Sequence, residues 1–184
     1  MNDFSINLFR YSNLLFKTYL REAIQTSKRA MLRVGFVPPP FRIQIDITDR
    51  CNFKCPTCTK WTSDPSKKEL KTHEWKTVFE KIRNVPLLRE VTIGGGEPFM
   101  RKDIFDILKF AKSQNLYTVV ISNGWYVDEY ALKRLGRIGV DRLMVSLNSL
   151  REPVHDQSRG APGSYERIMS LIESWREQPK ITDL

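Results

Sequence analysis

The sequence contains few of the side chains that bind soft metals, with three cysteines and two histidines in 184 residues. The cysteine count is odd and all three lie within eight positions, which makes a poor disulfide framework. No apolar run reaches the roughly 20 residues that span a bilayer, and the N-terminus lacks the compact apolar stretch and cleavage site of a secretory signal. These absences predict a cytoplasmic protein with reduced thiols and no transmembrane segment.

The formal net charge is +9, which favours contact with nucleic acids or acidic membranes when the cations are clustered. In this chain, Lys and Arg are scattered over helical segments among Asp and Glu, without a dense basic block. A face that combines clustered basic and aromatic residues, as single-stranded nucleic acid requires, is also missing. We therefore expect an ordinary solvated cationic surface and no nucleic-acid partner.

The chain consists of two parts of different character, separated by a run of prolines. Residues 4–33 carry apolar side chains at roughly helical spacing with basic residues between them, which predicts a helix. The triplet Pro38-Pro39-Pro40 follows as a stiff, extended spacer. We expect a helical N-terminal extension at residues 1–37 and one core domain at residues 38–184. The extension could contact the core domain, a partner or an anionic membrane, and packing on protein is favoured because polar residues interrupt its apolar stripe.

The core domain alternates between short β-branched runs and amphipathic segments. Alternation of this kind indicates an α/β fold with a parallel sheet, because each parallel strand needs a crossover helix. The pattern predicts four consecutive βα units. Their strands are expected at residues 41–47, 90–93, 117–121 and 142–147, and their helices at residues 72–83, 103–113, 129–135 and 165–177.

Each predicted strand is followed by a motif that can carry chemistry. In parallel α/β folds the functional residues gather at the carboxyl ends of the strands, which meet at one rim of the sheet. The four motifs are therefore expected to form one site. They are Cys51, Cys55 and Cys58 after the first strand, 94–98 (GGGEP) after the second, 122–124 (SNG) after the third, and 146–148 (SLN) after the fourth.

The cysteines follow the spacing C-x3-C-x2-C, which lets three sulfurs face one centre. Thiolates select zinc, copper(I) or iron–sulfur clusters. A fully protein-ligated cubane or zinc site needs four ligands, so a cubane on Cys51, Cys55 and Cys58 would keep one iron open. The alternatives are three unligated cysteines, or a zinc site completed by His73 or His155. Neither histidine lies at zinc-finger spacing, and we favour the [4Fe–4S] cluster.

The cysteine triplet after the first strand, together with Gly95-Gly96-Glu97-Pro98 after the second, resembles the radical S-adenosylmethionine (radical SAM) superfamily. The resemblance covers roughly residues 41–177. It implies a partial (β/α)6 barrel in which three cysteines hold three irons and SAM chelates the fourth. An electron from the cluster then cleaves SAM to methionine and a 5′-deoxyadenosyl radical, which abstracts hydrogen from a substrate.

The resemblance also implies roles for residues at the other strand ends. Glycines let the backbone approach a ligand, Glu97 can accept a hydrogen bond from the methionine ammonium, and Pro98 fixes the exit of the turn. Hydrogen bonds to SAM are expected from the third strand end, and contacts to the ribose hydroxyls from the fourth. The cofactor-binding candidates are Gly95, Gly96, Glu97, Pro98, Ser122, Asn123, Ser146, Asn148 and Arg159.

Arg159 belongs to a further segment, residues 155–166, that looks like the branch of the superfamily that modifies peptides and assembles cofactors. Its guanidinium is a candidate for the methionine carboxylate, which fits a fork of donors. From the residues alone, Asp156 and Arg159 could instead pair only with each other. His155 is expected to stabilise a loop rather than to act in catalysis.

The strand-end motifs also have purely structural interpretations. Three glycines alone are typical of a tight turn, and Asn123-Gly124 of ordinary turn chemistry. Ser146 and Asn148 could serve only as a turn or helix cap. Two positions depart from the family pattern: Thr57 stands where an aromatic residue is common beside the adenine, and Asn148 stands where an aspartate is common.

The family barrel has six βα units, and this sequence provides four. We therefore expect an N-terminal portion of a radical SAM core, either a fragment or half of a split protein. The expected function is SAM cleavage for hydrogen abstraction from an unknown substrate, a peptide or a cofactor precursor, with flavodoxin or ferredoxin as electron donor. No catalytic side chain is assigned beyond the cluster ligands. The alternative is a non-catalytic cluster- or metal-binding module that scaffolds a partner.

Overall fold

The computed structural model describes residues 39–64 and 68–176 and scattered residues between 23 and 37. The chain divides into two compact units, Met1–Pro39 and Pro40–Leu184. Most of the helix expected at residues 4–33 lies outside the described residues, although Ala23 and residues 25–27, 29–30 and 33 are helical. The helical extension at residues 1–37 therefore stays a prediction. Within the described part of the chain, no helix is both long and apolar enough to cross a membrane.

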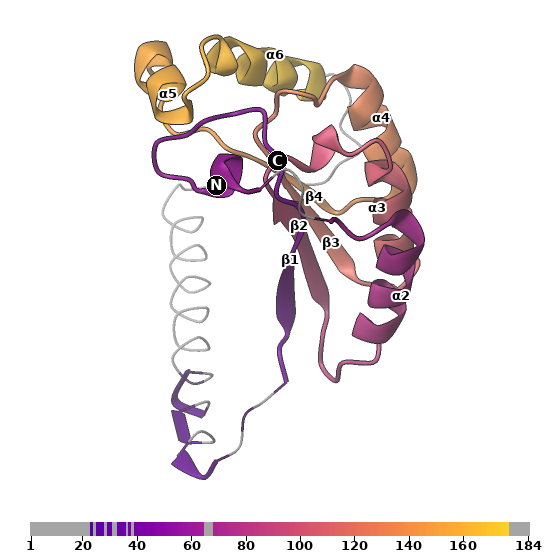
Figure 1. The fold of residues 1–184 in the computed structure, drawn as a ribbon. Helices are drawn as coiled ribbons and strands as arrows, with labels where there is room; N and C mark the ends of the chain where they lie inside the picture. The colour runs from indigo at the N-terminus through magenta and orange to yellow at the C-terminus, as the bar shows by residue number, and fades with distance from the viewer. Residues whose placement is uncertain are drawn as a thin grey trace, which may run out of the picture. The chain divides into compact units, whose positions relative to one another are not determined.

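The second unit is built on a sheet of four parallel strands in the order β1-β2-β3-β4 (Figure 1). The predicted α/β fold with four βα units is confirmed, because each strand is followed by helical segments before the next begins. The four strands are β1 (Arg42–Thr48), β2 (Glu90–Gly95), β3 (Tyr117–Ser122) and β4 (Arg142–Val145).

Three helices, α2, α3 and α4, lie along one side of the sheet (Figure 1). The ends of α4 follow ordinary capping rules: the Asp128 side chain accepts a hydrogen bond from the Ala131 N–H at its start, and Gly139 ends it in the left-handed region at φ 79°. The helices and short 3-10 turns are η1 (Lys60–Thr62), α2 (Thr72–Ile82), η2 (Pro98–Met100), α3 (Ile104–Lys112), α4 (Glu129–Ile138), α5 (Glu152–Arg159) and α6 (Ser164–Arg176).

The core forms where one row of strand side chains meets these helices. Ile45, Ile93, Val120 and Leu143 stand in register across the four strands and belong to or pack on the buried cluster. Burial of each large apolar side chain contributes about 1.5–3 kcal/mol. Successive strand residues point to opposite faces, so the next row, which includes Asp46 and Met144, faces away from the core.

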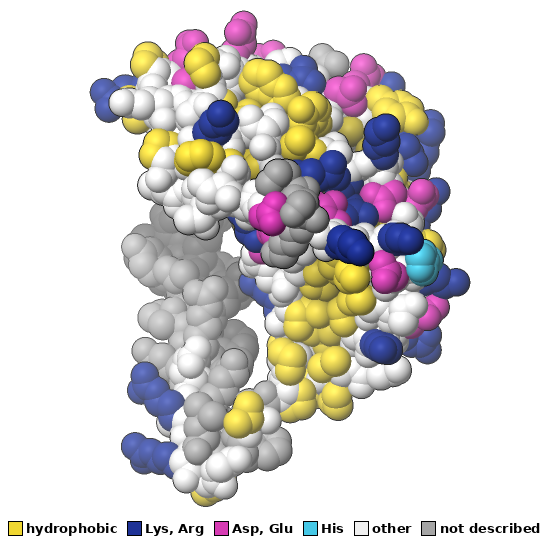
Figure 2. All heavy atoms as spheres, viewed as in Figure 1, with side chains coloured by type: hydrophobic (Ala, Val, Ile, Leu, Met, Phe, Trp, Pro, Cys, Tyr) yellow, Lys and Arg dark blue, Asp and Glu magenta, His cyan; other side chains and the backbone are white. Residues whose placement is uncertain are grey.

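The view in Figure 2 shows Lys and Arg interspersed with Asp and Glu over the helical side of the second unit. Several of these charges form pairs one helical turn apart, such as Lys133 with Glu129 at 2.6 Å. This face agrees with the scattered cationic surface expected from the sequence.

The segment between β4 and α6, interpreted above as a long loop, contains helix α5. That expectation was wrong because the segment is polar and lacks a long apolar stripe. Its ends nevertheless carry ordinary helix signals: Pro153 in the first turn and Gly160 in the left-handed region after the last. Arg159 and His155 therefore lie on a short helix, one turn apart, rather than on an extended loop.

Candidate functional site

The glycines after β2 pack directly against the backbone that leads into the cysteine loop. A Cβ atom at Gly95 would overlap the carbonyl oxygen of Thr48, and one at Gly96 would overlap that of Arg50. Hydrogen bonds join the same segments, since Gly96 N–H donates to Thr48 O (2.7 Å) and Glu97 N–H to Arg50 O (2.8 Å). The close approach expected of these glycines is thus made to the protein's own backbone. It fixes the stem of the cysteine loop against the end of β2.

Glu97 is fully buried at the centre of this rim. Its Oε1 accepts hydrogen bonds from Phe99 N–H (3.1 Å) and Ser122 Oγ–H (2.9 Å), and its Oε2 accepts one from Asn123 N–H (2.7 Å). A carboxylate offers about four acceptor positions, so one remains for a further donor. Pro98 follows at the first position of η2 and is itself buried.

Asn123 connects Glu97 to the cysteine loop. Its Nδ2 donates to Asn52 Oδ1 (2.9 Å) and lies 3.9 Å from Cys51 Sγ, while its Oδ1 accepts from Trp125 N–H (2.9 Å). Together with the backbone bond to Glu97, these contacts bring the ends of β1, β2 and β3 to one place. The structure therefore brings together Cys51, Gly95, Gly96, Glu97, Pro98, Ser122 and Asn123, as their positions along the chain predict.

The cysteine loop exposes its three thiols to different degrees: Cys55 is buried, Cys51 half-buried and Cys58 exposed. Backbone N–H groups point at two of the sulfurs, from Phe53 to Cys51 Sγ and from Lys60 to Cys58 Sγ, each at 3.4 Å. Hydrogen bonds to ligand sulfurs are one of the features by which proteins tune iron–sulfur clusters. This pattern of donors fits sulfurs that carry negative charge.

Among the described residues, no three His, Cys, Asp or Glu side chains converge closely enough to hold one metal ion. A mononuclear zinc site completed by a histidine would need such a group, whereas in a cubane each cysteine binds a different iron.

The buried acids of the site have raised pKa values. Burial raises the pKa of the Cys51 thiol, and the nearby charges of Glu97, Cys55 and Cys58 raise it further, against the hydrogen bond from Phe53. Burial also raises the pKa of Glu97, which its three hydrogen bonds and the charge of Arg159 partly offset. Burial thus favours the neutral forms of Cys51 and Glu97, and a bound cation or cationic ligand group would favour their charged forms.

The fourth strand end is held differently. Ser146 N–H donates to Ser122 O (3.1 Å), which places Ser146 beside β3. Asn148 is exposed, and its N–H donates to Nδ1 of the buried His155 (3.2 Å), while its Nδ2 donates to Ser158 Oγ (3.0 Å). Ser146 thus adjoins the site, whereas Asn148 is fastened to α5.

Helix α5 also contacts the cysteine loop. A Cβ at Gly160 would overlap the carbonyl oxygen of Lys54, and Arg159 Cζ lies 5.6 Å from the ring centre of Phe53. The Nε–H of Arg159 is buried and donates to no partner within the described residues. One interpretation of the sequence expected Asp156 to pair with Arg159, but these two side chains do not form a pair. Asp156 accepts hydrogen bonds from residues 163–165 at the start of α6.

A network behind the rim was not found from the sequence. The buried Arg101 guanidinium donates to Ile47 O (3.1 Å), to Glu69 (3.0 Å) and to both oxygens of Asp103 (2.9 and 2.8 Å). Glu69 in turn accepts from Thr48 Oγ1, at the end of β1. An arginine just after η2 was a weak signal, because only the tertiary fold shows that three segments meet around it: the end of β1, residues 69–70 and residues 101–103.

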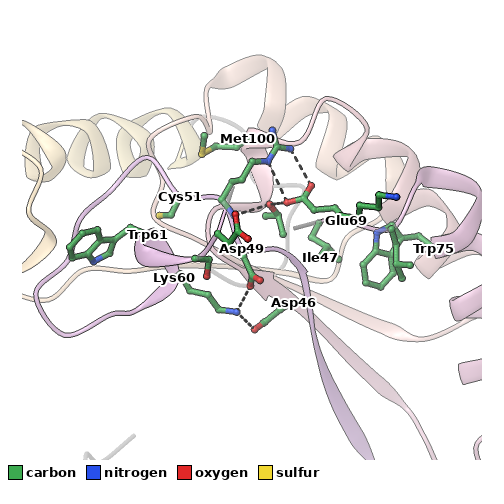
Figure 3. A pocket seen from close by; sticks show the side chains of 15 residues that line it. Asp46, Ile47, Asp49, Cys51, Lys60, Trp61, Glu69, Trp75 and Met100 are labelled. Atoms are coloured by element: carbon green, nitrogen blue, oxygen red, sulfur yellow. Dashed lines mark hydrogen bonds and ion pairs between the residues drawn. The ribbon is translucent and has the colours of Figure 1, made fainter. Parts of the chain in front are cut away.

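A pocket of about 880 Å³ lies against the end of β1, and Cys51 is one of the residues that line it (Figure 3). Lys60 pairs there with Asp46 (2.9 Å) and Asp49 (2.7 Å), which anchors η1 to β1. Glu97 and Asn123 do not line the pocket, but Cys51 does, so the pocket adjoins the rim site at this thiol. Its lining residues are Asp46, Ile47, Thr48, Asp49, Arg50, Cys51, Lys60, Trp61, Ser63, Asp64, Lys68, Glu69, Leu70, Trp75 and Met100.

Solved structures with the same fold include proteins with S-adenosylmethionine bound. SuiB of Streptococcus suis, solved bound to S-adenosylmethionine, matches with a TM-score of 0.62 at 17% identity, over 85% of this chain and 43% of that one. The protein anSMEcpe, solved with AdoMet and a Cp18Cys peptide, matches with a TM-score of 0.61 at 18% identity, over 76% of this chain and 40% of that one. At these identities the likeness shows the fold alone.

Curated relatives are closer in sequence. The PqqA peptide cyclase of Rhizobium meliloti (strain 1021) is 31% identical over 134 residues, which are 72% of this chain and 36% of that protein. The AdoMet-dependent heme synthase of Methanosarcina barkeri (strain Fusaro / DSM 804) is 33% identical over 147 residues, 78% of this chain and 41% of that protein. The chain thus spans well under half the length of these two relatives. The family model described as the radical SAM superfamily matches residues 45–183, so the chain belongs to this superfamily of enzymes.

Proposed function

We propose that this chain binds a [4Fe–4S] cluster through Cys51, Cys55 and Cys58 and binds S-adenosylmethionine at the iron that lacks a cysteine ligand. The observation that carries the proposal is the position of Asn123, which contacts both Glu97 and Cys51. Glu97 keeps an acceptor position for an ammonium group beside the cysteine loop. When bound, the reduced cluster would supply the electron that cleaves SAM and releases a 5′-deoxyadenosyl radical for hydrogen abstraction.

The protein's own residues would bind and orient this ligand. Glu97 would accept the methionine ammonium, and the buried Nε–H of Arg159 would donate to the methionine carboxylate. Ser146 and Asn148, on the β4 side of the rim, would meet the ribose hydroxyls. Gly95, Gly96, Pro98 and Ser122 would act by fixing the shape of the rim, because their contacts are made to Thr48, to Arg50 and to Glu97.

The substrate class we propose is a peptide, with a cofactor precursor as the second candidate. A curated relative is named a PqqA peptide cyclase, and a protein of the same fold was solved with its precursor peptide SuiA. A reduced cytoplasmic setting and a flavodoxin or ferredoxin as electron donor complete the proposal, since the cluster must receive electrons one at a time.

Anaerobic reconstitution with iron and sulfide tests the metal site. We expect about four irons and four sulfides per chain, and a reduced-state EPR signal that changes when SAM is added. The Cys51→Ala, Cys55→Ala and Cys58→Ala variants should each lose the cluster, whereas Thr57→Ala, in the same loop and exposed, should keep it. About one zinc without sulfide would overturn the proposal in favour of a non-catalytic metal-binding module.

Cleavage of SAM is tested separately on the reconstituted chain with dithionite as reductant. Formation of 5′-deoxyadenosine, followed by chromatography, is the expected result. A loaded cluster that binds SAM and never yields 5′-deoxyadenosine would contradict the enzymatic part of the proposal and leave the binding part standing.

A further inference from the structure

Three hydrogen bonds form a closed circuit between the end of β4 and helix α5. Asn148 N–H donates to His155 Nδ1 (3.2 Å), Asn148 Nδ2 donates to Ser158 Oγ (3.0 Å), and Ser158 Oγ–H donates to the carbonyl oxygen of His155 (2.7 Å). The circuit holds both the backbone and the side chain of Asn148. An exposed asparagine after a strand does not need this circuit of hydrogen bonds for the stability of the fold alone.

The chemistry of the circuit determines which way the Asn148 carboxamide points. The single hydroxyl proton of Ser158 is already donated to His155 O, so Ser158 Oγ can only accept from Asn148. Asn148 must therefore present its NH₂ group to Ser158. Its Oδ1 accepts no hydrogen bond from the part of the chain that the structure describes, and it remains as a fixed acceptor at the rim.

His155 has no other visible reason to be a histidine. It is fully buried, and its Nε2 has no partner within the described residues, which is unfavourable for a polar atom. A phenylalanine or leucine would fill the same volume without that cost. Its Nδ1 acts as an acceptor, which requires the neutral ring protonated on Nε2. The ring also contacts the Tyr165 ring edge to face, which a phenylalanine could do as well, so only the hydrogen bond to the Asn148 amide uses the chemistry of a histidine.

Helix α5 relates this circuit to the cysteine loop, because Gly160 at its end packs on the Lys54 backbone. We infer that His155 and Ser158 are positioning residues that hold Asn148 Oδ1 as the acceptor for a ribose hydroxyl of SAM. The inference rests on the proposed function. It also explains why asparagine suits this chain where aspartate is common: a carboxylate at position 148 would set an oxygen against Ser158 Oγ, whose proton is already used.

The test compares binding of SAM with binding of its 2′-deoxy and 3′-deoxy analogues to the reconstituted chain, by equilibrium dialysis. The wild-type chain should prefer SAM to at least one analogue by about tenfold, the value of one hydrogen bond. Ser158→Ala and His155→Phe should reduce that preference to about twofold or less, with unchanged iron content. His155→Asn, which returns an acceptor near the Nδ1 position, should restore most of it.

Ser113→Ala is the matched control, because Ser113 makes the same kind of bond to a carbonyl three residues earlier (Phe110 O, 2.8 Å) far along the chain on α3. It should leave the preference unchanged. If His155→Phe fails to fold, Ser158→Ala decides the result. Independently of the cluster, ¹⁵N NMR of the apo chain should show an unprotonated His155 Nδ1 coupled to the Asn148 amide.

The outcomes separate the two proposals. If the wild-type chain binds SAM with no preference over the deoxy analogues, or if Ser158→Ala and His155→Phe keep the full preference, the inference is wrong and the proposed function stands. If the iron-loaded wild-type chain does not bind SAM at all, the proposed function fails and the inference fails with it.

Discussion

The ends of β2 and β4 lie on the same rim and are built in opposite ways. At the end of β2, Glu97 is fully buried and accepts three hydrogen bonds from the protein, and Gly96 has no room for a side chain. At the end of β4, Asn148 is exposed and is held by one short helix. We infer from this difference that the β2 end is part of the folding core, whereas the β4 end can change without loss of the fold.

Replacement of Glu97 should have the largest effect. Glu97→Ala leaves the buried donors of Ser122, Asn123 and Phe99 without an acceptor, which should lower the free energy of unfolding by about 3 kcal/mol. Urea denaturation measures the change. SAM binding should be lost as well. A Glu97→Ala chain with wild-type stability would show that the β2 end is not part of the core.

Gly96→Ala should come next, because the new methyl group would overlap Arg50 O and push the stem of the cysteine loop away from β2. Overpacking of this kind costs about 2–3 kcal/mol, measurable by urea denaturation, and iron retention after reconstitution should fall with it. The matched variant is Gly94→Ala, whose methyl group would meet only ordinary contacts with Ile121 and Asp46. Equal stabilities of the two variants would contradict the packing argument.

The Arg101–Asp103 pair should give a smaller and pH-dependent effect. Burial alone would raise the pKa of Asp103, but the hydrogen bonds from Arg101 and Thr72 outweigh it and hold the pKa below the ordinary value of 3.8. A lowered pKa contributes stability that is present above pH 3.8 and is lost as the pH falls through the folded-state value. Asp103→Asn should therefore lower the free energy of unfolding by about 1–2 kcal/mol at pH 7.

Measurements in acid complete this prediction. The two chains should differ less and less in free energy of unfolding as the pH falls below 3.8, because Asp103 of the wild-type chain then becomes protonated. A difference that stays constant as the pH falls from 7 to well below 3.8 would show that the carboxylate charge is not what stabilises the network.

The smallest effect on folding should come from Asn148→Ala. An exposed side chain of this kind changes the free energy of unfolding by about 0.5 kcal/mol or less. The same variant should weaken SAM binding about tenfold in equilibrium dialysis, because it removes the acceptor at the β4 end. A large loss of stability with unchanged SAM affinity would reverse the comparison between the two ends.

The sequence predicted most of the fold because its signals are local. The alternation of β-branched and amphipathic segments predicted four parallel strands, and their order in the chain is their order in the sheet. The predicted bounds of the four strands and of helices α2, α3, α4 and α6 lie within a few residues of the observed ones. Helix α5 was missed because it buries little of its surface, so the 3.6-residue period was weak.

The site was predicted at the level of which residues meet, and less well at the level of how they bond. The strand-end rule placed Cys51, Glu97 and Asn123 on one rim. The packing of Gly96 on the Arg50 backbone and the joining of three segments by Arg101 depend on register and side-chain direction across long stretches of chain. Those are set by the tertiary fold, and no local pattern shows them.

The bonds from Gly96 and Glu97 to the backbone of Thr48 and Arg50 bear on the order of events during synthesis. The stem of the cysteine loop is fixed by residues that leave the ribosome long after the cysteines themselves. Until Gly96 and Glu97 have emerged, the three thiols are carried on an unanchored strand. If the chain binds the proposed cluster, delivery of iron and sulfide is therefore expected to be a late step that follows the pairing of β2 with β1.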